Sequence, residues 1–458
     1  MSENGGFYVE RPRWTCALGG ALAAAAALPG TVPVLHAGPG CAGNFAWTNN
    51  GASGLNVTGP CLGLSVPATN LQEEEVVFGG TERLREEIDG TLRIMEGKLY
   101  FVLTGCLPEV TGDDVPGLVA EYASRGIPLV AASAPGFKGD SYAGYGEVMK
   151  TIVAKVLKRK SPKNGSKSPG ASGKDMINVW GVPPHFDPFW KGNLLGIKKL
   201  AGLLDLEANV FFGPEANLGT VRNAARARLN VLVSGIYGAE AAELFLEIHG
   251  VPFVSAPLPF GTAASERFLD IVGAALSIPK SLTRKAKAKA RAERHAYLEP
   301  AVDLYNDMEI QRHALVVGDA NYAFALSDFL ADDLGWIPEL VVVTNELSPE
   351  EKSRLENHRK KTGGTPPERL IFENRRAGIR EAAKEIWGGR GEKYRDPLTP
   401  VFVAGSSLER SLARELGASC LSLSYPVSDR AILAKGFTGH FGGLELTEDL
   451  IGACAAVR

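Results

Sequence analysis

The stretch Leu99-Tyr-Phe-Val-Leu-Thr-Gly-Cys-Leu-Pro-Glu-Val-Thr-Gly-Asp-Asp-Val-Pro-Gly-Leu-Val-Ala-Glu-Tyr-Ala123 decides the fold of this chain. Its first six residues form an apolar run that stops at Gly105, which predicts a buried strand. Residues 115–123 carry apolar side chains at helical spacing, which predicts a helix soon after the strand. A strand, a glycine-containing loop and a helix make up the repeating unit of a doubly wound parallel sheet.

The same unit recurs along the chain, because strand-like runs alternate with helical patterns. We expect strands at 32–35, 99–104, 128–132, 177–180, 209–212, 230–233, 252–255, 314–317, 340–344, 400–403 and 420–423. We expect helices at 81–94, 115–123, 239–249 and 321–334. This alternation predicts an α/β protein built from three Rossmann-like domains, with parallel sheets flanked by helices.

Two polar segments predict the domain boundaries. Residues 158–174 are basic and rich in Gly, Ser and Pro, which is typical of a disordered linker. The alanine-rich, charged stretch from Ser281 to Tyr305 predicts a long helix that faces solvent. We therefore expect an N-terminal domain at 1–160, a second domain at 175–280, a connecting helix at 281–312 and a third domain at 313–458.

Composition narrows the class of protein. The chain has 458 residues, more than one hydrophobic core normally supports. Its net charge of −3 gives no case for nucleic acid or an anionic membrane as a partner. No apolar run reaches the ~18 residues that a membrane span needs. Six cysteines are too few for a disulfide scaffold in so long a chain, so we expect reduced thiols and a cytoplasmic location.

The segment near the N-terminus has two interpretations. Arg11 and Arg13, followed by the apolar residues 17–28, resemble a signal peptide. The stretch then continues into Val32-Pro-Val-Leu35, a buried-strand pattern. A helix packed under a sheet has the same composition as a signal peptide, and we favour that interpretation.

Three cysteines stand in glycine-rich loops: Cys16 precedes Gly19-Gly20, Cys41 lies between Gly40 and Gly43, and Cys106 follows Gly105. A thiolate that ligates a cluster is typically offered from such a turn, where backbone N–H groups approach the sulfur. The spacing matches neither a zinc ribbon nor a ferredoxin. Three thiolates are also one short of the set for an ordinary cluster. Either the chain supplies half of a site shared with a partner, or the three thiols are unrelated.

An ordered set of motifs resembles the large catalytic component of nitrogenase and its relatives. Each motif alone is weakly specific, but together they cover nearly the whole chain. They are Cys16, His36-Ala-Gly-Pro-Gly-Cys41, Val77-Phe-Gly-Gly80, Gly105-Cys106, Gly112-Asp-Asp114, Leu229–Ser234, Val251-Pro252, Pro257-Leu-Pro259, Gly318-Asp319, Ser424-Tyr-Pro426 and Asp429-Arg430.

This resemblance implies a metal site, partners and an activity. It implies that Cys16, Cys41 and Cys106 hold half of an iron–sulfur cluster, an eight-iron P-type or a 4Fe-4S cluster, completed by cysteines of an α-type partner. The chain would be the β-type subunit of an oxidoreductase, in an α₂β₂ heterotetramer. It would relay electrons from an ATP-dependent iron protein to a cofactor in the α-type chain.

The sequence departs from the family pattern at two positions. Where nitrogenase β subunits carry a serine that can ligate the oxidised cluster, this chain has Gly136. Where α subunits offer a thiolate to the active-site cofactor, it has Ser234, and a serine hydroxyl is a poor ligand for low-valent iron. The first departure argues against redox-dependent serine ligation and makes the chain resemble cofactor-assembly scaffolds and nitrogenase-like reductases more closely. The second departure favours a chain that relays electrons and does not hold the substrate.

Other candidate residues receive structural interpretations. We expect Cys61 to be structural or interfacial, and Cys420 and Cys454 to be packing residues. His440 stands near the position of a cofactor histidine in α subunits. We interpret it as a surface histidine or as one that lies behind a cofactor ligand without binding the cofactor. Asp113 and Asp114 precede a helical pattern, so we expect them to cap that helix.

The sequence leaves two main functions open. The first is an electron-relay subunit of a nitrogenase-like reductase, with methylthio-alkane reductase as the preferred member. The second is a scaffold subunit for cofactor assembly. Retention of all three cysteines favours the reductase. A binding protein without clusters would require the three loop cysteines to be a coincidence. No phosphate-binding loop or dinucleotide fingerprint is present.

Overall fold

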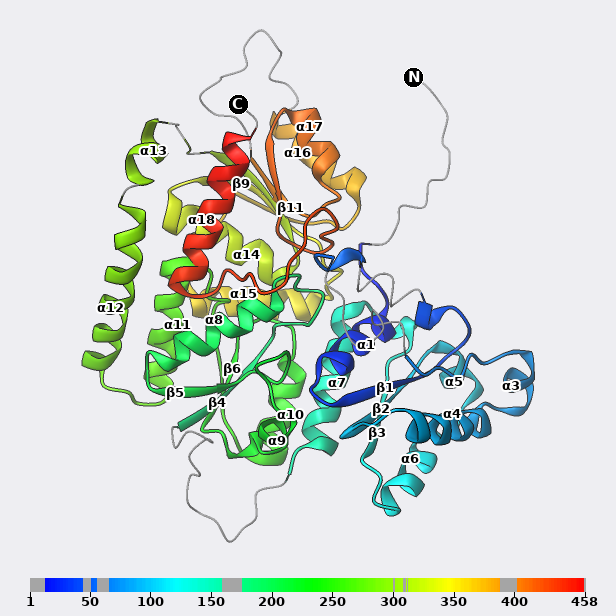
Figure 1. The fold of residues 1–458 in the computed structure, drawn as a ribbon. Coiled ribbons are helices and arrows are strands. Elements are labelled where there is room, and N and C mark those ends of the chain that lie inside the picture. The colour runs from blue at the N-terminus through cyan, green and yellow to red at the C-terminus, as the bar shows by residue number, and fades with distance from the viewer. Residues whose placement is uncertain are drawn as a thin grey trace, which may run out of the picture.

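In a computed structural model, the described residues are 13–43, 51–55, 66–158, 175–299, 301–307, 310, 312–387 and 402–456. They form three sheets, in which all the strands are parallel (Figure 1). The expected linker after Lys158 and the expected structural role of Cys61 fall outside these residues.

The first sheet has the strand order β1-β2-β3. Its two faces are covered by different helices, because alternate residues of a strand point to opposite faces. Phe101 and Leu103 pack toward α1 and α7, whereas Tyr100 and Val102 pack toward α4 and α6. The elements are α1 (Ala17–Ala27), β1 (Thr31–His36), α3 (Glu73–Phe78), α4 (Thr81–Ile94), β2 (Leu99–Thr104), α5 (Cys106–Thr111), α6 (Val115–Ser124), β3 (Leu129–Ser133) and α7 (Ser141–Thr151).

The second sheet has the order β5-β4-β6-β7. Helix α8 packs on β5, and α10 packs on β6 and β7. The elements are β4 (Asp175–Trp180), α8 (Trp190–Gly202), β5 (Leu206–Asn209), α9 (Leu218–Arg222), β6 (Leu229–Leu232), α10 (Ala239–His249), β7 (Phe253–Ser255) and α11 (Gly261–Ala275).

The third sheet has the order β10-β9-β8-β11-β12. Leu315 and Val317 of its central strand face α16 and α17, and Val316 faces α14. The elements are β8 (His313–Gly318), α14 (Ala320–Asp328), β9 (Ile337–Val343), α15 (Pro349–Thr362), β10 (Arg369–Phe372), α16 (Arg376–Trp387), β11 (Phe402–Gly405), α17 (Arg410–Leu416), β12 (Ser419–Ser422) and α18 (Gly439–Ala455).

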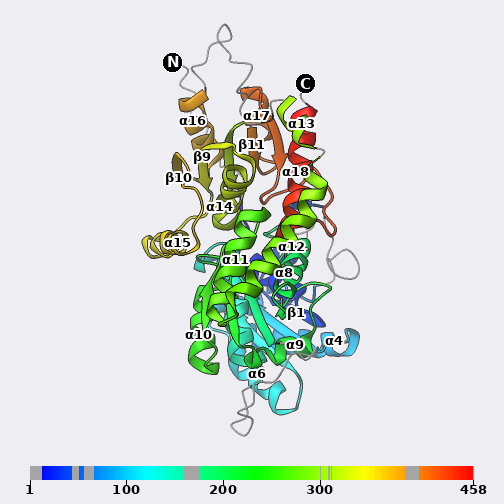
Figure 2. The same ribbon diagram turned by 90° about the vertical axis from the view of Figure 1, so that its left-hand side faces the viewer.

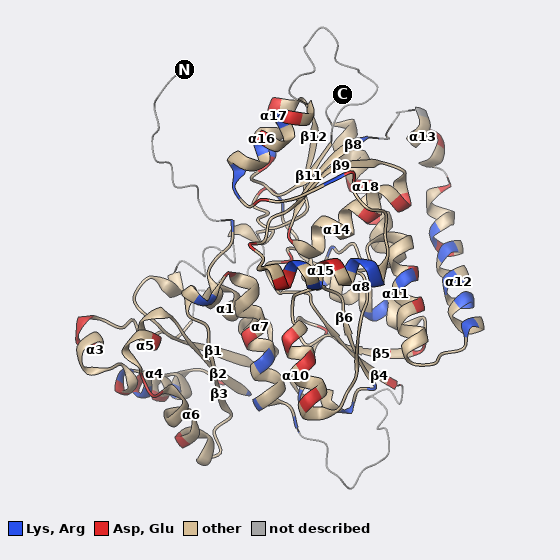
Figure 3. Ribbon diagram, turned by 180° about the vertical axis from the view of Figure 1, so that it is seen from behind, with Lys and Arg blue, Asp and Glu red and all other residues tan. Residues whose placement is uncertain are grey.

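Helices also connect the second and third sheets. Helix α12 (Lys280–Leu298) is followed by α13 (Ala301–Asp307). It packs against α11 and α18 through Thr283, Ala286 and Ala290, while its lysines and arginines form a basic outer face (Figure 3). Helix α18 lies beside α8, α11 and α12 (Figure 2). The domain boundaries themselves stay a prediction.

The expected α/β class is confirmed, and the differences are local. The strand expected at 209–212 is β5, which ends at Asn209. Strand β10 was not predicted, because Arg369 and Leu370 are exposed at the edge of the sheet and the pattern is weak. The helix expected at 321–334 divides into α14 and a π-helical turn at Phe329–Asp333. The apolar segment Ala17–Ala27 is a buried helix.

Candidate functional site

The three loop cysteines lie at the same edge of the first sheet. Cys41 follows β1 and Cys106 follows β2, and the carboxyl ends of neighbouring parallel strands share an edge. Cys16 is the residue before α1, and it is held by a β-bridge to Asp140. The next residue, Ala17, donates its N–H to the Gly139 carbonyl at 2.9 Å. Residues far apart in the sequence are thus brought into one region.

Gly136 lies between two of these cysteines. Its N–H donates to Sγ of Cys106 at 3.0 Å. A Cβ built on Gly136 would stand 3.3 Å from Sγ of Cys106 and 3.4 Å from Sγ of Cys16. Both sulfurs therefore lie within 3.4 Å of one point, and a side chain at position 136 would crowd them. Gly136, which stands where the family pattern places a serine, therefore leaves room for the sulfurs.

Cys41 is the third member of this group. Burial raises the pKa of its thiol, and the neighbouring Cys16 and Cys106 thiols raise that pKa further. Cys106 is exposed, while Cys16 and Cys41 are half-buried. Within the part of the chain that the structure describes, no three His, Cys, Asp or Glu side chains form a group that could hold a metal ion.

Exposed apolar side chains lie on the same domain as the cysteines. Phe137 follows Gly136 and is 64% exposed, and Val110 on α5 is 75% exposed. Val77 and Phe78 at the end of α3 are 72% and 83% exposed. Helix α3 packs beside α5, the helix that begins with Cys106. Exposed apolar groups clustered in this way are typical of a surface that another protein covers.

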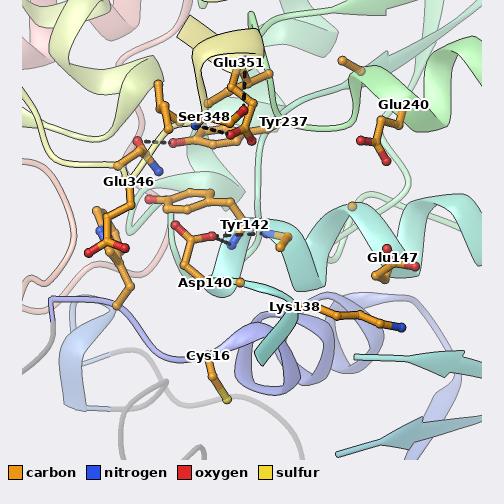
Figure 4. A pocket seen from close by; sticks show the side chains of 18 of the residues that line it. Cys16, Lys138, Asp140, Tyr142, Glu147, Tyr237, Glu240, Glu346, Ser348 and Glu351 are labelled. Carbon is orange, nitrogen blue, oxygen red and sulfur yellow. Dashed lines mark hydrogen bonds between the residues drawn. The ribbon is translucent and has the colours of Figure 1, made fainter. Parts of the chain in front are cut away.

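A cavity of about 1270 Å³ adjoins both Cys16 and Gly136. It is lined by residues that belong to all three sheet regions, among them Asp140, Tyr237 and Glu351 (Figure 4). Burial raises the pKa of the Asp140 carboxyl to about 6. The N–H groups of Tyr142 and Ala143, which donate to this carboxyl as it caps α7, act in the opposite direction and lower that pKa. The lining mixes polar and apolar side chains and carries charges of both signs.

Ser234 takes no part in this lining. Its buried Oγ accepts the N–H groups of Ile236 at 3.2 Å and Tyr237 at 2.9 Å, so it closes its own turn. Tyr237 stacks on Tyr142 with 4.1 Å between ring centroids. The Tyr237 hydroxyl donates to Oδ1 of Asn345 at 2.8 Å. Tyr237 therefore contacts Tyr142 and Asn345 beside the turn that Ser234 closes, at the edge of the cavity.

Two other interpretations are resolved by the structure. Asp114 caps α6 by accepting the Gly117 N–H at 2.9 Å, as expected. The same expectation is wrong for Asp113, whose buried carboxylate accepts the Gly80 N–H before α4 and contacts His36. The sequence places both aspartates just before one helix, but it does not show to which helix each carboxylate is hydrogen-bonded.

His440 is buried, so the first of its two interpretations, a surface residue, is wrong, while a role behind a cofactor ligand stays a prediction. The physical reason is the close approach of α18 to α11: a Cβ on Gly443 would stand 2.5 Å from Cα of Gly261. Cys454 is buried in the core and Cys420 is half-buried in β12. Burial raises the pKa of the Cys420 thiol to about 12, and Glu409 and Asp429 add to that rise.

The comparison with known proteins gives the family. The sequence matches the family described as Nitrogenase component 1 type Oxidoreductase over residues 16–455, so the chain belongs to this family of oxidoreductases. It is 23% identical over 453 residues to the nitrogenase molybdenum-iron protein beta chain of Azospirillum brasilense, which covers 92% of this chain and 78% of that protein. It is 25% identical over 463 residues to the corresponding beta chain of Methanothermobacter thermautotrophicus, with 92% and 89% covered.

A solved structure, "Nitrogenase Cp1 at pH 6.5", superposes with a TM-score of 0.76 at 18% identity, covering 100% of this chain and 95% of that chain. The family resemblance and the nitrogenase component 1-like fold expected from the sequence are confirmed. The chain is similar to nitrogenase β chains along most of its length. No helix among the described residues is long and apolar enough to cross a membrane.

Proposed function

We propose that this chain is the β-type subunit of a nitrogenase-like reductase, and that Cys16, Cys41 and Cys106 hold half of an iron–sulfur cluster shared with an α-type subunit. The observation that carries the proposal is the convergence of the cysteine loops around Gly136, where two sulfurs lie within 3.4 Å of one point. The cluster would be an eight-iron P-type or a 4Fe-4S cluster, and it would supply one-electron transfer when bound.

The residues present fit such a group. Thiolates are the soft, anionic ligands that iron–sulfur clusters take. The Gly136 N–H donates to a sulfur, and such bonds tune the reduction potential of a cluster. A cluster spreads its ligands over several irons, so it does not need three side chains around one ion. Two half-buried cysteines beside an exposed one also fit a cluster that a second chain completes.

The partners follow from the same surface. The exposed Val77, Phe78, Val110 and Phe137 fit contact with a second protein. An α-type chain would complete the cluster in an α₂β₂ heterotetramer, and an ATP-dependent iron protein would deliver electrons to it. The relatives are β chains of nitrogenases, which favours this role over a scaffold for cofactor assembly. The cytoplasmic location stays a prediction.

The substrate would be reduced in the α-type chain. Ser234 is engaged with its own turn, so it offers no ligand to a cofactor in this chain. Gly136 replaces the serine of nitrogenase β subunits, which favours a nitrogenase-like reductase of another substrate. Among such reductases, we propose a methylthio-alkane reductase.

The test is the iron content of the anaerobically purified complex with the α-type chain. Cys41→Ala should remove most of the shared cluster and its iron–sulfur EPR signal. Cys420→Ala, which changes a half-buried cysteine of β12, is the matched control and should keep both. Equal iron in the wild type and in Cys41→Ala would overturn the proposal.

A further inference from the structure

A buried histidine–aspartate pair lies beneath the two cysteine loops that follow β1 and β2. His36 is the last residue of β1, and Asp113 lies between α5 and α6. Nε2 of His36 stands 2.9 Å from Oδ2 of Asp113, and both side chains are almost fully buried, at 0% and 1% exposed. His36 precedes Cys41 by one short loop, and Asp113 follows Cys106 by one turn of helix and a glycine.

Each member of the pair has further contacts with the surrounding loops. Nδ1 of His36 lies 3.2 Å from Oγ1 of Thr69, and that oxygen accepts the Ala37 N–H at 3.1 Å. The His36 carbonyl accepts the Gly105 N–H, next to Cys106, at 2.9 Å. The pair therefore joins the segment that leads to Cys41 with the segment that carries Cys106.

Asp113 adds a third segment to this network. Its Oδ1 accepts the Gly80 N–H at 2.8 Å and the Thr111 hydroxyl at 3.1 Å. A Cβ on Gly80 would stand 2.7 Å from Oδ2 of Asp113 and 3.1 Å from Cε1 of His36, so the backbone at Gly80 packs directly on the pair. Gly80 is the residue before α4, and only Gly79 separates it from the exposed Val77 and Phe78.

We propose that His36 and Asp113 are positioning residues, which fix the separation of the Cys41 and Cys106 loops and so hold the cysteines ready for the cluster. This inference rests on the proposed function. Its physical basis is that the partners are desolvated: a buried polar group that loses its partner is destabilising, so the loops are held in one arrangement. Neither residue contacts the sulfurs in this role. They act by placing the loops that carry them.

The test compares two neighbouring aspartates. Asp113→Ala removes the contacts with His36 and Gly80, whereas Asp114→Ala removes only the exposed cap of α6. The measurement is the rate at which the anaerobic complex loses iron to a chelator, together with stability toward urea. Mutating a residue that orients metal ligands typically lowers metal affinity about 10–100-fold. We therefore expect Asp113→Ala to lose iron at least about tenfold faster than the wild type. Asp114→Ala should lose iron at the wild-type rate, although it loses the N-terminal cap of α6.

Two further variants guard against misfolding. Asp113→Asn keeps the size of the side chain and an acceptor for the Gly80 N–H, so it should restore slow iron loss. Thr69→Val keeps the shape of Thr69 but removes the hydroxyl that His36 and Ala37 contact, so it should accelerate iron loss. These variants separate positioning from general stability, because iron loss should not follow the urea midpoint across the set.

The outcomes are distinguishable from those of the proposed function. Wild-type complex without cysteine-dependent iron would refute the shared cluster itself. Cysteine-dependent iron in the wild type, with wild-type rates of loss in Asp113→Ala and Thr69→Val, would refute only the positioning role. Iron loss that simply tracks urea stability in all four variants would refute it as well.

Discussion

The close crossing of α1 and α7 predicts that two glycine-to-alanine substitutions on α7 have opposite effects on stability. A Cβ on Gly144 would stand 1.8 Å from the Ala17 carbonyl oxygen and 2.6 Å from the Ala21 nitrogen. Gly20 meets the other helix in the same way, with a Cβ placed 1.8 Å from the Ser141 carbonyl oxygen. The obstacles are backbone atoms, so no rotamer change can relieve them. Among the described residues, no atom outside α7 lies within 4 Å of the position of a Cβ on Gly146, which belongs to α7 like Gly144.

The magnitudes follow from two opposing terms. Overpacking of a core costs typically about 1–3 kcal/mol, and a contact with rigid backbone belongs at the upper end of that range. Replacing Gly by Ala inside a helix returns about 1 kcal/mol. We expect Gly144→Ala to lower the free energy of unfolding by about 2 kcal/mol and Gly146→Ala to raise it by roughly 0.5–1 kcal/mol.

The assay is urea denaturation followed by far-UV circular dichroism, with the first unfolding transition compared between variants. Gly144→Ala should also reduce iron in the complex, because α1 begins directly after Cys16. If Gly144→Ala proved as stable as Gly146→Ala, close contact between α1 and α7 would be refuted, and so would the placement of Cys16 by that contact.

Two further predictions concern buried charges. Burial raises the pKa of Asp319 to about 7, with Asp187 adding to the rise, so the folded state holds a proton that the unfolded state releases near pH 4. The wild type should therefore lose stability relative to Asp319→Asn as the pH rises from about 4 to about 7, and the difference should stay constant above about pH 7. A difference in urea midpoints that does not depend on pH would contradict this prediction. Arg13 donates to Oε1 of Glu409 at 2.7 Å with both side chains buried, so Arg13→Ala should cost about 3–5 kcal/mol, because Glu409 is left as an unpaired buried charge. The control Arg354→Ala breaks partly exposed pairs with Glu243 and Glu350 and should cost under about 1 kcal/mol in the same assay; equal losses would contradict the prediction.

The sequence alone determined the fold class and many of the elements. Helices α4 and α10 have the predicted bounds, and β2 coincides with the predicted strand at 99–104. These elements were predictable because buried parallel strands and amphipathic helices carry strong local patterns. The weak edge strand β10 and the π-helical turn after α14 were not, since packing against neighbours decides them.

For the candidate site, the sequence supplied the residue types and the tertiary structure decided which of them meet. The glycine settings singled out Cys16, Cys41 and Cys106, but their sequence spacing says nothing about distance. Only the parallel pairing of β1 with β2 and the crossing of α1 with α7 bring Cys16 and Cys106 together at Gly136, with Cys41 close to both. The His36–Asp113 pair was invisible for the same reason. A contact between residues that far apart in the chain is set by sheet geometry, and local pattern does not encode it.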